Sequence, residues 1–259
     1  MRPPNWHQAH AAKQSFGERV ADKVASFIGS WTFILLQAFL LTIPREDILK
    51  SIITPINPKA QVLDSQIFLP GQDGYDASVK SNGSAAYDKV DIAKAKQLLA
   101  GKTPTVKILY NTENPNRVDS FQAIQASAAK AGFNVVDGGS PQWSSLLSGG
   151  DYDASIFGWV NPGAGNAQLP QLFQIGNPGN YNNFNDQQAS DLAVKSQTTL
   201  DPSKLLDIKE QIDARTFATG YGLPLFQLPG LFAYTGKIKG IQYFGGQNGI
   251  FWNFWEWTK

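Results

Sequence analysis

The sequence lacks cysteine altogether, so disulfide bonds, thiolate metal sites and cysteine nucleophiles are excluded. Its only two histidines, His7 and His10, lie close to the N-terminus. A Ser-His-Asp triad or an HExxH zinc site needs histidine, so neither can be assembled in the rest of the chain. The glycine-rich stretches complete no phosphate-binding loop. We therefore expect no metal and no cofactor, and the sequence does not indicate an enzyme.

Charge is also sparse. Only 17% of the residues are charged, and the formal net charge is +1. Lysine and arginine are dispersed among aspartate and glutamate, so there is no basic stripe that could follow a phosphate backbone. Nucleic acid is therefore not predicted as a partner.

Aromatic residues, in contrast, are plentiful: seven Trp, eight Tyr and sixteen Phe. Together with 42% hydrophobic residues they are ample for a packed core. An aromatic excess combined with many Asn, Gln and Gly residues often accompanies recognition of polar organic ligands. Ordinary use in the core and on the surface is the alternative.

One long apolar run stands near the N-terminus. Residues 24–43 read VASFIGSWTFILLQAFLLTI and carry no formal charge. A helix of about 20 apolar residues crosses roughly 30 Å of hydrocarbon, so this run is a candidate transmembrane helix. The basic flank before it predicts an inside N-terminus and places the rest of the chain outside the membrane. A helix buried in the protein is the alternative.

The middle of the chain predicts an α/β fold. Residues 105–110 alternate as a strand, residues 117–131 carry apolar side chains at helical spacing, and residues 133–136 form a second strand. A crossover of this length favours a parallel pair. Further elements are predicted as helices from 45, over 92–100 and over 141–147, a loop over 161–185, two later helices, and strands over 223–227, 231–235 and 238–243.

The candidate site follows an apolar strand predicted over residues 151–159, GDYDASIFGW with its leading glycine. Residues that leave the end of a buried strand are placed to line a crevice. An aromatic wall beside side-chain amides would suit a peptide or a similar polar ligand. The candidate ligand-binding residues are Tyr152, Phe157, Trp159, Asn161 and Asn166. Asp151 and Asp153 are expected to satisfy a turn rather than to cleave a bond.

From residue 44 to residue 259 the chain resembles the C-terminal part of family 5 extracellular solute-binding proteins. The resemblance rests on segments that occur in the family's order: REDIL, AYDKVDIAKAKQLLAG, RVDSFQAIQASAAKAGFNV, GDYDASIFGW, LPLFQLPGLFAY and FWNFWEW. It implies a peptide-binding component of an ABC importer, with an ABC permease as partner. It also implies two α/β lobes of a periplasmic-binding-protein-like fold, of which this chain would carry the second lobe and return strands.

Peptide-binding members often place an aspartate shortly after the tryptophan of this strand to receive the peptide's amino group. Here Val160-Asn161-Pro162 follows instead, so a peptide or another polar small solute is expected, without that ammonium partner.

Residues 7–42 resemble the start of DUF1003 membrane proteins. The expected division is therefore 1–43 as a polar segment with a membrane helix and 44–259 as the solute-binding portion, joined as a fusion. The expected location is the extracytoplasmic face of a bacterial envelope. A membrane-anchored interaction module without a ligand is the alternative function.

Overall fold

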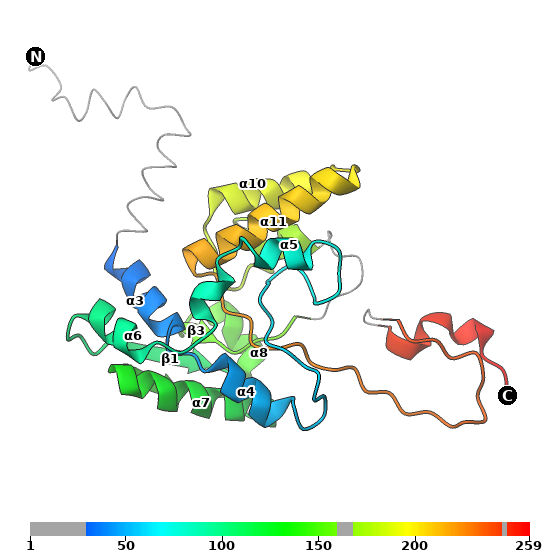
Figure 1. The fold of residues 1–259 in the computed structure, drawn as a ribbon, viewed down its shortest axis with the longest axis horizontal. Helices are drawn as coiled ribbons and strands as arrows, with labels where there is room; N and C mark the ends of the chain where they lie inside the picture. The colour runs from blue at the N-terminus through cyan, green and yellow to red at the C-terminus, as the bar shows by residue number, and fades with distance from the viewer. Residues whose placement is uncertain (1–29, 160–167, 245–247) are drawn as a thin grey trace, which may run out of the picture.

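The computed structural model describes residues 30–159, 168–244 and 248–259, and these form an α/β fold (Figure 1). Their sheet has the strands β1 (Thr105–Leu109), β2 (Asn134–Asp137) and β3 (Ala154–Ser155), in the order β2-β1-β3. Both pairings are parallel, which confirms the α/β prediction. Because the chain passes from β1 to β2 on one side and then to β3 on the other, the order reverses beside β1. Ligands of open parallel sheets bind at such a reversal, outside the carboxyl ends of the strands.

The crossover helix α7 (Pro115–Ala131) is positioned by the signals in its own sequence. The Asn114 side chain accepts a hydrogen bond from the backbone N–H of Arg117, and Pro115 occupies the first helical position. Gly132 ends the helix with a φ of 110°, a left-handed conformation that glycine adopts readily. The helix buries Phe121, Ile124 and Ala128 in the same core as Ile108 of β1.

The described part of the apolar run, residues 30–43, packs against this core. It contains α3 (Trp31–Leu40), which Ser30 caps and whose Ala38, Phe39 and Leu40 are buried. Phe39 meets Phe133 edge to face at 5.3 Å between ring centroids. Residues 24–29 lie outside the described part. In the part that the structure describes, no helix is long and apolar enough to cross a membrane. The packing of α3 agrees with the alternative prediction of a helix buried in the protein.

Two further helices flank this core. Helix α4 (Arg45–Ile52) begins at the residue where the sequence predicts a helix, and α6 (Ile92–Leu99) is capped by Asp91 as predicted. The links beyond α4 include α5 (Tyr75–Val79) and the 3-10 turn η1 (Ser84–Tyr87).

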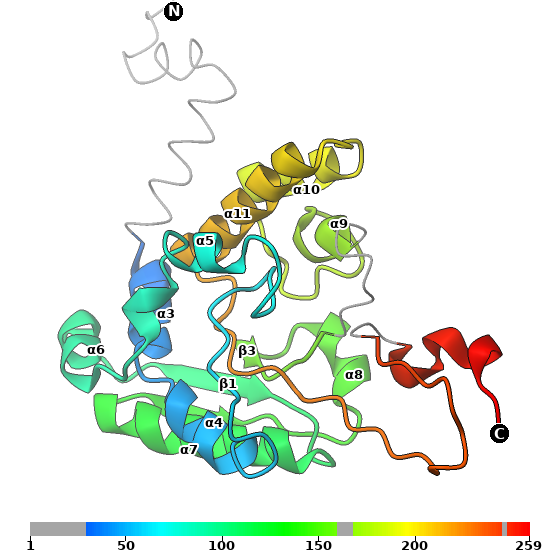
Figure 2. The same ribbon diagram turned by 45° about the vertical axis from the view of Figure 1, so that its right-hand side comes forward.

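A second core lies among α9 (Gln168–Phe173), α10 (Gln187–Ser196) and α11 (Pro202–Thr219). Phe173 and Ile212 are its most buried large residues. Figure 2 shows this helical group across from the sheet, with the linking segments between them. Helix α9 corrects the prediction of a loop over 161–185. Its Leu169, Leu172 and Phe173 are buried by tertiary packing, which the local sequence does not reveal.

The three strands predicted after residue 222 do not form as a sheet. Residues 223–243 form no ladder and contain a turn at residues 236–237; among the described residues only isolated bridges join them to a neighbour, Val62 to Phe226 and Lys239 to Thr258. A strand needs a partner edge for its backbone groups, and the described part offers none along most of this segment. The chain then turns through η3 (Gly249–Glu256), which lies away from both cores (Figure 1).

Candidate functional site

A large cleft of about 2250 Å³ lies between the two cores. One wall comes from the sheet: the residues after β3 and the first turn of α7. The other comes from the helical group and includes Leu169, Leu172 and Tyr221. Linking segments around residues 61–69 and 219–230 form the remainder. The cleft therefore lies at the carboxyl ends of β1 and β3, where the strand order predicts a ligand site.

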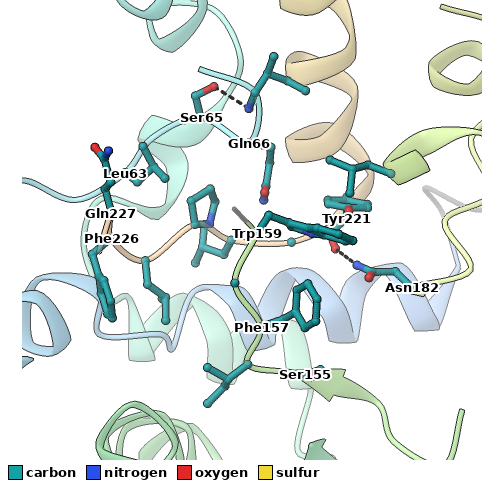
Figure 3. A pocket seen from close by; sticks show the side chains of 18 of the residues that line it. Leu63, Ser65, Gln66, Ser155, Phe157, Trp159, Asn182, Tyr221, Phe226 and Gln227 are labelled. Atoms are coloured by element: carbon teal, nitrogen blue, oxygen red, sulfur yellow. Dashed lines mark hydrogen bonds between the residues drawn. The ribbon is translucent and has the colours of Figure 1, made fainter. Parts of the chain in front are cut away.

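The strand that carries the predicted site is shorter than expected. The last ladder bond runs from the Ile156 N–H to the carbonyl of Leu109 at 2.9 Å, and the Ser155 hydroxyl donates to the same carbonyl at 3.0 Å. Phe157, Gly158 and Trp159 then leave the sheet and line the cleft. The prediction of a strand that continues to residue 159 is wrong, because β3 ends at Ser155 and the chain then turns away from β1. The rings of Phe157 and Trp159 follow this turn (Figure 3).

These rings belong to a continuous cluster, which we call the aromatic wall: Trp143, Phe157, Trp159 and Tyr181. Phe157 and Trp159 meet edge to face at 4.8 Å, and Tyr181 stacks on Trp159 at 6.1 Å with only 9° between the ring planes. Trp143, in the short helix α8 (Trp143–Leu146), meets Phe157 at 5.4 Å. Trp159 keeps 41% of its surface exposed and Tyr181 keeps 36%. Rings ordered against one another yet open to solvent are arranged for contact rather than for core packing.

Tyr152 supports this wall. Its hydroxyl donates to the carbonyl of Leu147 at 3.0 Å and lies 3.3 Å from the carbonyl of Tyr181, and burial raises the pKa of the phenol. The predicted residue therefore lines the cleft but is engaged by the protein. Two other predicted residues, Asn161 and Asn166, lie outside the described residues.

The facing wall presents polar groups and one buried phenol. Burial raises the pKa of Tyr221 to about 12, and its ring packs against Phe184 at 4.9 Å. The amide of Asn182 donates to the Tyr221 carbonyl at 3.1 Å, and Gln66 approaches from a linking segment (Figure 3). Side-chain amides beside aromatic rings can meet both the polar and the apolar parts of a peptide-like solute.

Charged groups of the sheet wall fall into two kinds. Asp151 pairs with the ammonium of Lys107 at 2.6 Å, and Asp153 accepts from the Lys107 backbone N–H at 2.8 Å. Both aspartates therefore contact Lys107 of β1, whereas the sequence predicts that they satisfy a turn. Arg117 instead lies over the ring of Trp143, 4.2 Å from its centroid, and has no carboxylate partner in the described part of the chain.

Several of these residues are not identifiable from sequence. Tyr181 and Asn182 lie in a stretch rich in Gly and Asn that predicts only a loop, and Tyr221 precedes a predicted strand. Arg117 reads as the first residue of a helix. Among the residues that the structure describes, no group of three or more His, Asp or Glu side chains could hold a metal ion.

The chain matches the family model of the bacterial extracellular solute-binding proteins, family 5 (middle region), over residues 36–181, which is more than half of its length. Oligopeptide-binding proteins OppA of Mycobacterium tuberculosis and Mycobacterium bovis are 25% identical over 185 residues, covering 66% of this chain. The aligned part is 31% of OppA, so the chain spans about a third of these relatives.

Solved structures share the fold. The periplasmic EDTA-binding protein EppA gives a TM-score of 0.75 at 21% identity, covering 87% of this chain and 45% of EppA. NikZ from Campylobacter jejuni, in complex with Ni(L-His), gives 0.66 at 20% identity over 88% of this chain and 48% of NikZ. AppA from Bacillus subtilis, in complex with a nonapeptide, gives 0.61 at 18% identity over 86% and 47%. The fold is therefore that of periplasmic binding proteins.

The predicted DUF1003-like start over residues 7–42 finds no support. The family match begins at residue 36, inside that segment, and α3 packs into the core that the match covers. The family resemblance is confirmed for the segments that the match covers, from REDIL at residue 45 to GDYDASIFGW at residue 159. The chain belongs to the bacterial extracellular solute-binding proteins of family 5.

Proposed function

We propose that this chain is a substrate-binding component of an ABC-type importer and that it holds a peptide or a similar polar solute in the cleft. The observation that carries the proposal is the aromatic wall, an ordered and half-exposed set of rings at the carboxyl end of β3. Relatives named for oligopeptide binding and a fold shared with a nonapeptide complex support the ligand class.

The cleft offers what a flexible polar ligand needs. Flat rings give contact area without demanding one side-chain shape, so they suit peptides of varied sequence. The amides of Asn182 and Gln66 add donors and acceptors for a ligand backbone. Binding without conversion also follows from the family, whose members are described as solute-binding proteins.

As a component of an importer, the protein would work on the outer side of the membrane and deliver its ligand to an ABC permease. A membrane anchor through residues 24–43 is not part of the proposal, because the described part of that run contains α3, which packs against the core. No observation favours an interaction module over solute binding.

Tryptophan fluorescence tests the proposal directly. We expect short peptides of two to five residues to change the emission saturably, and calorimetry to give the same affinity. Trp159→Ala should weaken binding at least about tenfold, which is about 1.4 kcal/mol. Trp31→Ala is the matched control, since Trp31 is 52% exposed and lies outside the cleft. Folded protein that binds none of a broad peptide panel at millimolar concentration would overturn the proposal.

A further inference from the structure

We infer that Arg117 receives a carboxylate of the ligand, so that the cleft selects solutes by their anionic end. This inference rests on the proposed function and names the chemistry of its substrate. It comes from a difference among the three arginines of the described residues, together with the place of one of them in the cleft.

Two of the three arginines are neutralised within the protein. Arg45 pairs with Asp64 at 2.7 Å and with Asp88 at 3.3 Å, and Arg215 pairs with Asp186. Arg117 has no such partner in the described residues. Its Nη1 atom is moreover buried without a hydrogen bond there. A buried charged donor without an acceptor destabilises the folded protein. A ligand that supplies the acceptor would remove this cost.

The guanidinium of Arg117 is placed to meet such a partner. It lies over the Trp143 ring, 4.2 Å from the ring centroid, and Arg117 itself lines the cleft. A Cβ built on Gly158 would lie 4.0 Å from Nη2, so the guanidinium lies beside the backbone that leads to Trp159. A ligand packed on Trp159 would therefore bring a terminal group within reach of Arg117.

A carboxylate fits this position better than a neutral group. Burial lowers the pKa of Arg117, yet a guanidinium remains charged at physiological pH and calls for an anion. Carboxylate oxygens match two of its parallel N–H donors, and that bidentate geometry strengthens the bond. The cation–π contact with Trp143 helps to hold the guanidinium beside the cleft before a ligand binds.

The other charges that face the cleft agree. Lys209 of α11 lines the opposite wall without an ion pair among the described residues, and burial lowers its pKa. The lining carboxylates are Asp73 and Asp153, which are exposed, and Asp186, which Arg215 neutralises. Of the lining cations without an ion pair among the described residues, Arg117 and Lys209 are partly buried, whereas Lys59 is exposed.

The sequence after Trp159 points the same way. Val160-Asn161-Pro162 supplies no carboxylate for a ligand ammonium group. We therefore expect recognition through the carboxylate end of a peptide, with little contribution from its amino group.

The test uses trialanine and tetraalanine as free acids, as C-terminal amides and as N-acetyl acids, titrated calorimetrically into the full chain. We expect the amides to bind the native protein about 30-fold more weakly than the acids, and the N-acetyl acids to bind within about threefold of them. Arg117→Met should lose the same 30-fold for the acids and should no longer distinguish acid from amide. Arg117→Lys should restore part of the difference, and Lys102→Met is a control outside the cleft.

Equal binding of acid and amide by the native protein would overturn the inference while leaving peptide binding intact. Retention of the acid preference by Arg117→Met would overturn it as well. If no peptide binds, the proposed function fails separately, and citrate at constant ionic strength becomes the probe. If citrate raises the melting temperature of the native protein but not that of Arg117→Met, the carboxylate site is supported. If citrate affects both proteins equally, or neither, the inference is overturned.

Discussion

The surroundings of Arg45 and of Arg117 contrast within one protein. Arg45 is 2% exposed and is surrounded by acceptors, with two carboxylates and the carbonyls of Tyr87, Leu63 and Pro224 within 3.5 Å. Arg117 is half-buried, lies against an aromatic ring, and keeps a donor without a partner in the described residues. The first joins segments of the chain that lie far apart in sequence, whereas the second faces a cleft.

The contrast separates residues that stabilise the fold from residues available to a ligand. Asp213 belongs with Arg45: it is fully buried and accepts hydrogen bonds from Ser65, Gln66, Ser78 and Asn82. A buried charge whose partners are all internal contributes to the architecture and has no capacity left for a solute. Trp159 belongs with Arg117, since both line the cleft and neither is fully buried.

The largest expected effect follows from removing Arg45. Arg45→Met would leave Asp64 without its close partner and three carbonyls without a donor. We expect the free energy of unfolding to fall by about 3–5 kcal/mol, as for other buried pairs that lose one member. Urea unfolding followed by circular dichroism measures this loss. Lys50→Met, which removes an exposed pair with Glu46, is the control and should change stability by less than about 1 kcal/mol.

Asp213→Asn should have the next largest effect. The amide keeps the size of the carboxylate but turns an NH₂ group toward donors, so at least one of the four bonds becomes a clash of two donors. We expect a loss of about 2–4 kcal/mol in the same urea experiment. Asp207→Asn on an exposed position of the same helix is the control. Unchanged stability in Asp213→Asn would show that this carboxylate is not the structural centre described above.

An alkaline loss of stability should follow from Tyr221. Its pKa is about 12 in the folded protein against an ordinary value of 10.0, because burial disfavours the phenolate. The folded state therefore holds the proton more tightly, and its stability is complete below pH 10 and falls as the pH rises toward 12. We expect this raised pKa to account for about 2–3 kcal/mol of the free energy of unfolding that is lost at alkaline pH. Tyr221→Phe should lose less stability between pH 10 and pH 12 than the native protein, as measured by urea unfolding. The same dependence of the unfolding free energy on pH in both proteins would contradict this expectation.

The sequence predicts the framework well because local signals and burial agree there. Asn114, Pro115 and Gly132 mark the ends of α7, and apolar spacing predicts its buried face, so the unit from β1 to β2 could be predicted. The segment 223–243 also has the composition of strands, but strand pairing depends on a partner edge elsewhere in the fold, which composition cannot reveal. Helix α3 has the apolar composition that suggests a membrane helix, but its last residues, Ala38, Phe39 and Leu40, are buried in the protein core instead.

The candidate site could be predicted only in part, for a similar reason. Phe157 and Trp159 follow a strand, so their place at a crevice is inferable from the order of the chain. Tyr181 and Tyr221 join them through tertiary folding, from a loop and from the end of a helix. The importance of Arg117 depends on which carboxylates lie near it, and no sequence pattern reports that absence.

The most direct test of the contrast is the urea unfolding free energy of the native protein and of Arg117→Met, each with and without saturating trialanine acid. Without peptide we expect the two proteins to agree within about 1 kcal/mol, because Arg117 contributes little to the fold. Peptide at 100 times its dissociation constant should stabilise the native protein by about 2.7 kcal/mol and the variant by much less. An Arg117→Met protein that is as unstable as Arg45→Met, yet is still stabilised fully by the peptide, would contradict the account.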